Sequence, residues 1–241
     1  MPPKKSRARS DAVYKFPDGF INLSVNLNKS FFKPQPETLI EDQIVVIEKF
    51  FASDLCNELI RSFEKQLTLE TTPIIKSKEY AVRFNDRCSL TDFKSAEILW
   101  NYLRSLLLQQ TEYEDEEIDK IKDNFSAACG LNPQLRIYRY RSGHHFNPHY
   151  DESVVCPLND KGTSKGKTKW TLLIYLTGDE EFKGGGTIFH SEMGGTESLN
   201  IHPGKGMALL HKHGDDCLLH EAELVKSGVK WVLRSDVAYP L

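Results

Sequence analysis

The hydrophobic positions in the second half of the chain form short clusters separated by glycine-rich or charged connectors. Short runs of β-branched and aromatic residues bounded by turn residues are typical of strands. The pattern predicts seven strands, over residues 135–140, 170–177, 186–190, 199–202, 206–211, 217–223 and 231–239. Short strands at this spacing favour a sandwich or barrel.

The first half of the chain shows helical spacing instead. One stripe of apolar residues recurs every four positions and consists of Leu55, Leu59, Phe63 and Leu67. It predicts a helix that Ser53 caps, with Asp54 in the first turn. A second stripe predicts a helix over residues 92–109.

Three further segments are less regular. Residues 20–40 alternate weakly before Pro34 and Pro36, which predicts an edge strand and an ordered arm. The β-branched run 44–47 predicts a strand. A short helix after the acidic residues 112–117 is expected to end at Gly130, because glycine commonly follows the last helical residue.

Helices first and strands afterwards predict an α+β fold, with the helices packed on one face of the sheet. The length of 241 residues suits a single domain overall. Within it we expect a flexible basic leader (1–19), a strand and helix support region (20–134) and a barrel core (135–241).

Composition narrows the partners and the location. The net charge of −3 gives no overall field for nucleic acid, and no apolar run is long enough to span a bilayer. The basic start of the chain fits either a disordered tail or a nuclear address, and it lacks the apolar stretch of a secretory signal. Five scattered cysteines without a Cys-x-x-Cys pair favour reduced thiols. We expect a cytoplasmic or nuclear protein, and nothing in the pattern selects an oligomeric state.

Three residues form a candidate metal site. His149 and Asp151 are two positions apart, and side chains at i and i+2 of an extended strand point to the same face. The distant His220 can complete the set from a neighbouring strand. Two histidines and one carboxylate are the ligands of non-haem Fe(II) oxygenases, and they leave three positions open.

Other histidines compete for this assignment. His144 and His145 have no carboxylate two positions on, whereas His211 and His213 share a strand face and precede Asp215. We expect His211 and His213 to support the wall or the mouth of the barrel. His190 and His202 have no partner pattern.

Several motifs occur in an order that resembles one known family. Tyr140 precedes the His-x-Asp pair, residues 184–189 read Gly-Gly-Gly-Thr-Ile-Phe, and residues 233–239 read Leu-Arg-Ser-Asp-Val-Ala-Tyr. Together they resemble the prolyl-4-hydroxylase-like Fe(II)/2-oxoglutarate-dependent dioxygenases over about residues 135–239. The resemblance implies a double-stranded β-helix, the jelly-roll barrel of the cupin type.

The resemblance also implies roles for single residues. His149, Asp151 and His220 match the iron ligands and therefore the catalytic centre. Lys230, ten positions after His220, matches the cation that binds the far carboxylate of 2-oxoglutarate. Tyr140, Tyr175 and Thr187 are the hydroxyl donors expected around that carboxylate, although residues such as Tyr175 and Thr187 also fill strands without any ligand. Arg234 is a competing cation, and we interpret it as a structural partner of Asp236 or a group behind the ligands.

The implied reaction hydroxylates a C–H bond and converts 2-oxoglutarate and dioxygen to succinate and carbon dioxide, with ascorbate as the expected reductant. A protein residue such as proline is the natural substrate by resemblance, while small molecules and nucleic acids stay open. Arg83, Asn85 and Arg87 alternate along one segment. They could contact a peptide substrate or form a salt-bridged surface strand.

Two other functions use the same residues. The barrel could be a catalytically silent module that senses metal or 2-oxoglutarate, or a zinc hydrolase with Glu221 as its base. The basic segment 161–169 after the His-x-Asp pair could gate the substrate or serve only solubility.

Overall fold

The computed structural model describes residues 14–74, 81–109, 115–191 and 198–241. The basic positions 4–9 lie outside this part, as do residues 112–114 of the acidic run and the predicted glycine connector at 194–195. Of the expected leader, the described part begins at Tyr14, and Phe16 is buried with its ring 4.3 Å from that of Phe20. Phe16 therefore packs this part of the expected leader against the protein.

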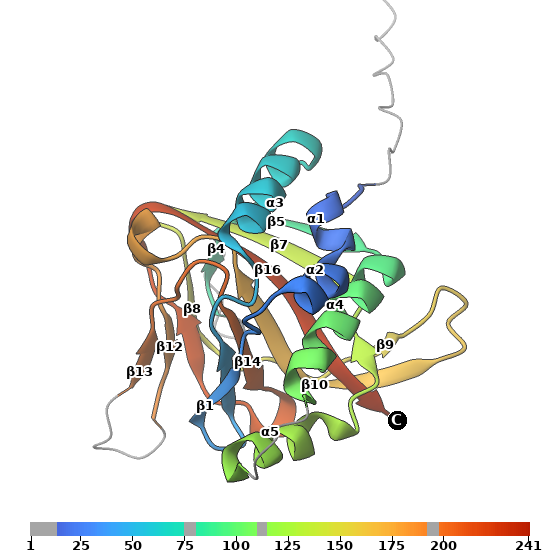
Figure 1. The fold of residues 1–241 in the computed structure, drawn as a ribbon. Coiled ribbons are helices and arrows are strands. Elements are labelled where there is room, and N and C mark those ends of the chain that lie inside the picture. The colour runs from blue at the N-terminus through green and yellow to red at the C-terminus, as the bar shows by residue number, and fades with distance from the viewer. Residues whose placement is uncertain (1–13, 75–80, 110–114, 192–197) are drawn as a thin grey trace, which may run out of the picture.

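Five helices lie on one side of the described structure (Figure 1). Their bounds are α1 Asp18–Ile21, α2 Leu23–Lys29, α3 Ser53–Gln66, α4 Phe93–Leu107 and α5 Glu116–Ser126. The two long predicted helices are confirmed as α3 and α4. Asp92 caps α4 by accepting a hydrogen bond from the backbone N–H of Ser95.

The strands form two antiparallel sheets, and all seven predicted strands are present. The larger sheet contains β1 Pro36–Ile40, β2 Ile44–Ile47, β14 Ala208–Lys212, β10 Lys165–Tyr175, β16 Val225–Pro240, β7 Gln134–Arg141, β5 Asp86–Thr91 and β3 Glu70–Thr71, in this order. Three short strands, β6 Gly130–Leu131, β9 Val155–Pro157 and β11 Phe182–Gly184, pair beside this row. The smaller sheet contains β13 Leu199–Ile201, β12 Thr187–Phe189, β15 His220–Ala222, β8 His145–His149 and β4 Arg83–Phe84, in this order.

Strand β16 shows how the larger sheet separates two cores. Trp231 and Leu233 point outward and pack in the cluster that contains the helices. Val232 points inward and packs with residues of the smaller sheet, such as Phe189. Because side chains alternate along a strand, Lys230 and Arg234 point inward as well. The space between the two sheets therefore receives two cations.

Four local predictions differ from the structure in whole or in part. Residues 20–27 form helices rather than an edge strand, because the buried residues are Phe20, Leu23 and Leu27 at helical spacing. The apparent alternation came from Ile21 and Val25, which are exposed.

The helix caps also differ from the prediction. Ser53 is the first residue of α3, and Ala52 before it offers no side-chain cap. Helix α5 ends at Ser126, before Gly130, which belongs to β6 and pairs with Ala238 of β16. The segment 161–169 is a loop only in part, because residues 165–169 begin β10 and residues 165–167 pair with β9.

None of the helices in the described ranges is both long and apolar enough to cross a membrane.

Candidate metal centre and its cavity

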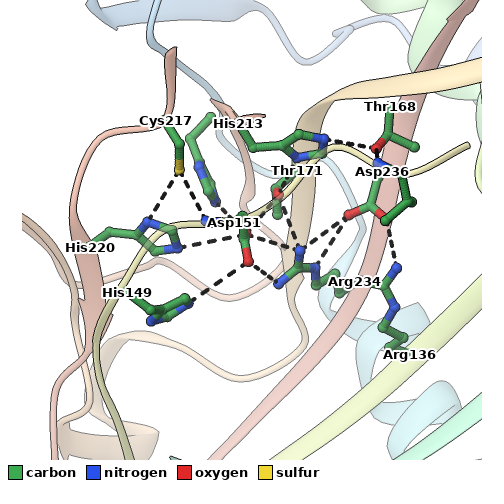
Figure 2. A network of polar contacts seen from close by, with 12 residues as sticks. Arg136, His149, Asp151, Thr168, Thr171, His213, Cys217, His220, Arg234 and Asp236 are labelled. Carbon is green, nitrogen blue, oxygen red and sulfur yellow. Dashed lines mark hydrogen bonds and ion pairs between the residues drawn. The ribbon is translucent and has the colours of Figure 1, made fainter. Parts of the chain in front are cut away.

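Neighbouring strands bring the three candidate ligands together. His149 ends β8 and His220 begins β15, and the antiparallel register places the two residues opposite each other. Asp151 follows two residues beyond β8. The potential ligand atoms of these three residues all lie within 4.8 Å of one another, and Figure 2 shows both imidazoles turned toward the carboxylate.

Both imidazoles are fixed with one nitrogen aimed at Asp151. The Nδ1 atom of His149 lies 2.8 Å from the Asn147 carbonyl, and that of His220 lies 2.9 Å from the Leu218 carbonyl. A carbonyl only accepts, so each Nδ1 carries the proton and each Nε2 keeps its lone pair. The Nε2 atoms lie 3.9 Å and 3.7 Å from Asp151 oxygens. A backbone carbonyl behind the ring is the usual support of a metal-binding histidine.

Burial and neighbouring charges keep these donors in the protonation state that a metal requires. Burial lowers the pKa of His149 to about 3 and also lowers the pKa of His220. Burial acts to raise the pKa of Asp151, but the Arg234 guanidinium and the surrounding histidines together outweigh it, and this pKa falls well below its usual range. Two neutral imidazoles and one carboxylate therefore meet at one point, and this donor set fits a divalent metal ion.

The Asp151 carboxylate is held on several sides. Arg234 contacts both of its oxygens: Nη1 donates a 3.2 Å hydrogen bond to Oδ1, and Nη2 forms a 2.9 Å ion pair with Oδ2. The Thr171 hydroxyl donates to Oδ2 at 2.9 Å. The backbone N–H of Asp151 donates to the Cys217 sulfur at 3.2 Å. These contacts fix the carboxylate before any metal binds.

Arg234 connects the candidate ligand to a second carboxylate. Its Nη2 lies 3.3 Å from Asp236, which accepts a 2.7 Å hydrogen bond from Arg136 on the neighbouring strand (Figure 2). The contact with Asp236 and the position behind the ligand Asp151 agree with the two sequence interpretations of Arg234. Arg234 thus supports the ligand from behind.

Lys230 has very different surroundings. Its side chain is 2% exposed, and its ammonium donates a 2.6 Å hydrogen bond to the Gly185 carbonyl. None of the ion pairs among the described residues involves Lys230. Burial lowers its pKa to about 7. A buried ammonium group without a carboxylate partner is costly, so the site fits an anion that comes from outside the chain.

The expected hydroxyl donors surround the same ammonium group. Lys230 Nζ lies 5.6 Å from the ring centre of Tyr140 and 5.2 Å from that of Tyr175. The Tyr175 hydroxyl is 2.7 Å from the Thr187 hydroxyl. These four residues line one cavity together with the three candidate ligands. The structure thus brings the predicted metal and co-substrate residues into a single space.

The predicted substrate residues do not share one face. Arg83 lines the cavity, with its guanidinium 3.9 Å from the ring centre of Phe146. Asn85 is fully buried and hydrogen-bonded to Thr72, and Arg87 does not line the cavity. The alternation fails because the segment leaves the smaller sheet after β4 and joins the larger sheet at β5.

Three other histidines of the sequence analysis have partners outside the candidate ligand set. His190 pairs with Glu221 at 3.1 Å, and the Asp179 carbonyl lies 3.0 Å from His202 Nε2. His213 contacts the hydroxyls of Thr168 and Thr171, so it supports the wall as expected.

One residue of the centre, Thr171, which binds the candidate ligand Asp151, was missed. His211 was expected to support the wall or the mouth of the barrel, and it lines the cavity itself. The signal for His211 was its shared strand face with His213, but the sequence could not show which face turns inward.

A larger groove between α2 and α3 contains none of the candidate ligands. Size alone therefore does not locate the chemistry of this protein.

Comparison with known proteins finds a family model that covers part of the chain. Residues 135–235 match the model of the 2OG-Fe(II) oxygenase superfamily. No curated protein matches the chain.

Several solved structures share its fold. A Pseudomonas putida prolyl-4-hydroxylase aligns at a TM-score of 0.53 and 15% identity, over 91% of this chain and 100% of that chain. A Trichoplax adhaerens prolyl hydroxylase, in complex with a hypoxia inducible factor oxygen degradation domain peptide fragment, aligns at 0.53 and 14%, over 91% and 89%. The viral collagen prolyl hydroxylase of Paramecium Bursaria Chlorella virus-1 aligns at 0.52 and 19%, over 87% and 97%. The predicted double-stranded β-helix fold is confirmed, and residues 135–235 are similar to the 2OG-Fe(II) oxygenases.

Proposed function

We propose, on the premise that residues 135–235 form the barrel of a 2OG-Fe(II) oxygenase, that the chain is a 2-oxoglutarate-dependent dioxygenase. His149, Asp151 and His220 would hold Fe(II), and Lys230 would bind the far carboxylate of 2-oxoglutarate. The single observation that carries the proposal is a buried ammonium group, without an ion pair to any described residue, in the same cavity as a His/Asp/His cluster.

The donor set fits ferrous iron. It consists of two neutral imidazoles and one anionic carboxylate on adjoining strands, with each ring supported by a backbone carbonyl. When bound, the iron would supply the oxidative decarboxylation of 2-oxoglutarate by dioxygen and the hydroxylation of a C–H bond. Arg234 and Thr171 hold Asp151 in place for this role.

The dicarboxylate fits the other end of the cavity. Lys230 offers a point charge rather than a fork, so hydroxyl groups are needed to complete the binding of a carboxylate. Tyr175 and Thr187 already form a hydroxyl pair, and Tyr140 is buried beside them. Apolar residues such as Leu173 and Val232 line the space between and restrict water.

For the substrate we propose a protein or peptide residue such as proline. The support is the likeness to prolyl hydroxylase structures, one of which carries a peptide. Arg83, stacked on Phe146 beside His149, is placed to meet that substrate, with Asn85 and Arg87 further from the cavity. Small molecules and nucleic acids are alternative substrates on the same barrel.

A direct experiment is succinate formation by the purified protein with Fe(II), 2-oxoglutarate, ascorbate and a proline-containing peptide library. We expect succinate, together with peptides heavier by one oxygen atom. Replacing His149 by Ala should remove both products. Metal and 2-oxoglutarate binding without succinate under any condition would favour the silent sensor module. Turnover that is indifferent to 2-oxoglutarate would contradict the proposal and favour hydrolysis.

A further inference from the structure

One buried nitrogen near the candidate metal centre has no function in the account above. The Nε2 atom of His211 is buried and has no hydrogen-bond partner within the described part of the chain. The side chain is 1% exposed and lines the same cavity as His149, Asp151 and His220. An orphaned polar atom at this depth calls for an unseen partner.

The strand around His211 makes the residue more unusual. In β14, Leu209 packs inward between the two sheets, and Ala208 and Leu210 pack outward beneath the helices. His211 therefore takes an inward position at which an apolar residue would leave no polar atom without a hydrogen-bond partner. Its ring lies against Phe189 and His220, with ring centres 5.3 Å and 4.5 Å away.

His211 also repeats the geometry of the two candidate imidazole ligands. Its Nδ1 lies 3.3 Å from a backbone carbonyl, that of Lys212, which places the proton on Nδ1 and leaves a lone pair on Nε2. That Nε2 lies 3.7 Å from Asp151 Oδ2, the same distance as the Nε2 atom of His220. Three imidazoles thus direct their Nε2 atoms to one carboxylate, although two would complete the facial set.

We propose that His211 is a fourth protein ligand of the metal ion before 2-oxoglutarate binds. The proposal rests on the metal site proposed above and adds one imidazole to it. The occupied site would then have three histidines and one aspartate, with two of six positions open. A competing arrangement exists, because His211 also forms a group with Cys217 and His220 whose potential ligand atoms lie within 4.8 Å.

The number of imidazoles bound to the metal can be counted by NMR spectroscopy with Co²⁺ as the only added component. An imidazole bound through Nε2 keeps one Nδ1 proton, and paramagnetic Co²⁺ moves that proton signal far outside the normal spectrum. The signal disappears in deuterated water if the proton exchanges. We expect three such signals in the wild-type protein and two in His211→Phe. Affinity for Co²⁺ should also fall in that variant, by about 10-fold or more.

His144→Phe is the matched control. His144 is a buried histidine with an unpartnered nitrogen, but it packs on Phe84 and does not line the cavity. This variant should keep three signals and the wild-type affinity.

The outcomes separate the two proposals. Two signals in the wild-type protein would overturn the role of His211 and leave the His/Asp/His site intact. Three signals that persist in His211→Phe would overturn it as well. A thiolate-to-cobalt absorption band that disappears in Cys217→Ser would place the metal with Cys217, against both proposals. The absence of any shifted signal would contradict the metal site itself.

Discussion

Two cations on strand β16 lie four residues apart on the same face, and their surroundings are opposite. Arg234 contacts two carboxylates, Asp151 at 2.9 Å and Asp236 at 3.3 Å. Lys230 contacts none among the described residues and donates only to the Gly185 carbonyl. The pKa values follow this difference, because neighbouring carboxylates raise the pKa of Arg234 against the effect of burial, whereas burial lowers that of Lys230 to about 7.

This difference distinguishes a cation that supports the fold, Arg234, from a cation that is suited to bind a ligand, Lys230. A buried cation with its own carboxylates completes the fold and holds a neighbouring ligand in position. A buried cation without a carboxylate lowers stability until an anion arrives from outside, which is a property of a binding site. The Arg234 end of the cavity is therefore preformed, and the Lys230 end awaits its co-substrate.

The largest expected effect concerns the metal that would lie between the two ends. His149→Ala removes one of three proposed ligands, so Fe(II)-dependent succinate formation should fall to background. Measured metal content should fall with it. His190→Ala is the control, since His190 pairs with Glu221 outside the candidate set. Full activity of His149→Ala would contradict the metal site proposed between the Arg234 and Lys230 ends of the cavity.

Arg234→Met should destabilise the protein strongly. It leaves the Asp151 and Asp236 carboxylates short of a buried partner, and breaking a buried ion pair in this way costs about 3–5 kcal/mol. Chemical denaturation without metal measures this loss. Arg136→Met, which removes one partner of Asp236 and leaves the contacts of Asp151 intact, should cost less. Equal losses in the two variants would show that the Asp151 contact contributes little.

Lys230→Met should have the opposite effect on stability and stabilise the free protein. The folded-state pKa of about 7 lies below the ordinary lysine value of 10.5, so the charged form opposes folding below pH 7, and this cost disappears as the pH rises toward 10.5. Removing the charge should stabilise the free protein at neutral pH by roughly 1–3 kcal/mol. The same change should weaken 2-oxoglutarate binding by about 2–5 kcal/mol. A destabilised variant that still binds 2-oxoglutarate would make Lys230 structural.

The affinity for 2-oxoglutarate should depend on pH through Lys230. In the empty site its pKa is about 7, and a bound dianion raises it. Affinity should therefore be constant below that pH and weaken above it, by up to about tenfold per pH unit. Calorimetric titrations of the metal-loaded protein across this range test the slope. Lys230→Arg stays charged, so a slope that persists in this variant would assign the titration to another group.

The smallest effect concerns the hydroxyl pair beside Lys230. Thr187→Val removes the partner of the Tyr175 hydroxyl. It should weaken 2-oxoglutarate binding by about 0.5–1.5 kcal/mol, the usual net value of one hydrogen bond. Ser89→Ala, on a more distant strand, should leave binding unchanged. If Thr187→Val also binds normally, Thr187 only fills its strand.

The sequence predicted the fold where periodicity was strong and local. The stripes of α3 and α4 and the β-branched clusters after residue 134 were sufficient for the helices and for seven strands. The prediction failed where tertiary contacts decide between helical and strand periodicity, as at residues 20–27. The buried positions of this segment are defined only by its packing on α3 and α4. The prediction also failed at Asn85, where the chain changes sheets.

The site was predictable to a different extent. Spacing and family resemblance indicated His149, Asp151, His220 and Lys230, and the structure places all four along one cavity. Spacing could not indicate His211 or Thr171, because their proximity depends on the register of β14 against β10, in which these two residues lie opposite each other. The ion pair between Arg234 and Asp151 likewise joins residues 83 positions apart.

The most direct test of the account is the visible charge-transfer band of the protein mixed anaerobically with Fe(II) and 2-oxoglutarate. We predict a band that needs both components together, that is lost in Asp151→Ala, and that requires much more 2-oxoglutarate in Lys230→Met. A wild-type protein that shows no band at saturating Fe(II) and 2-oxoglutarate would contradict the account.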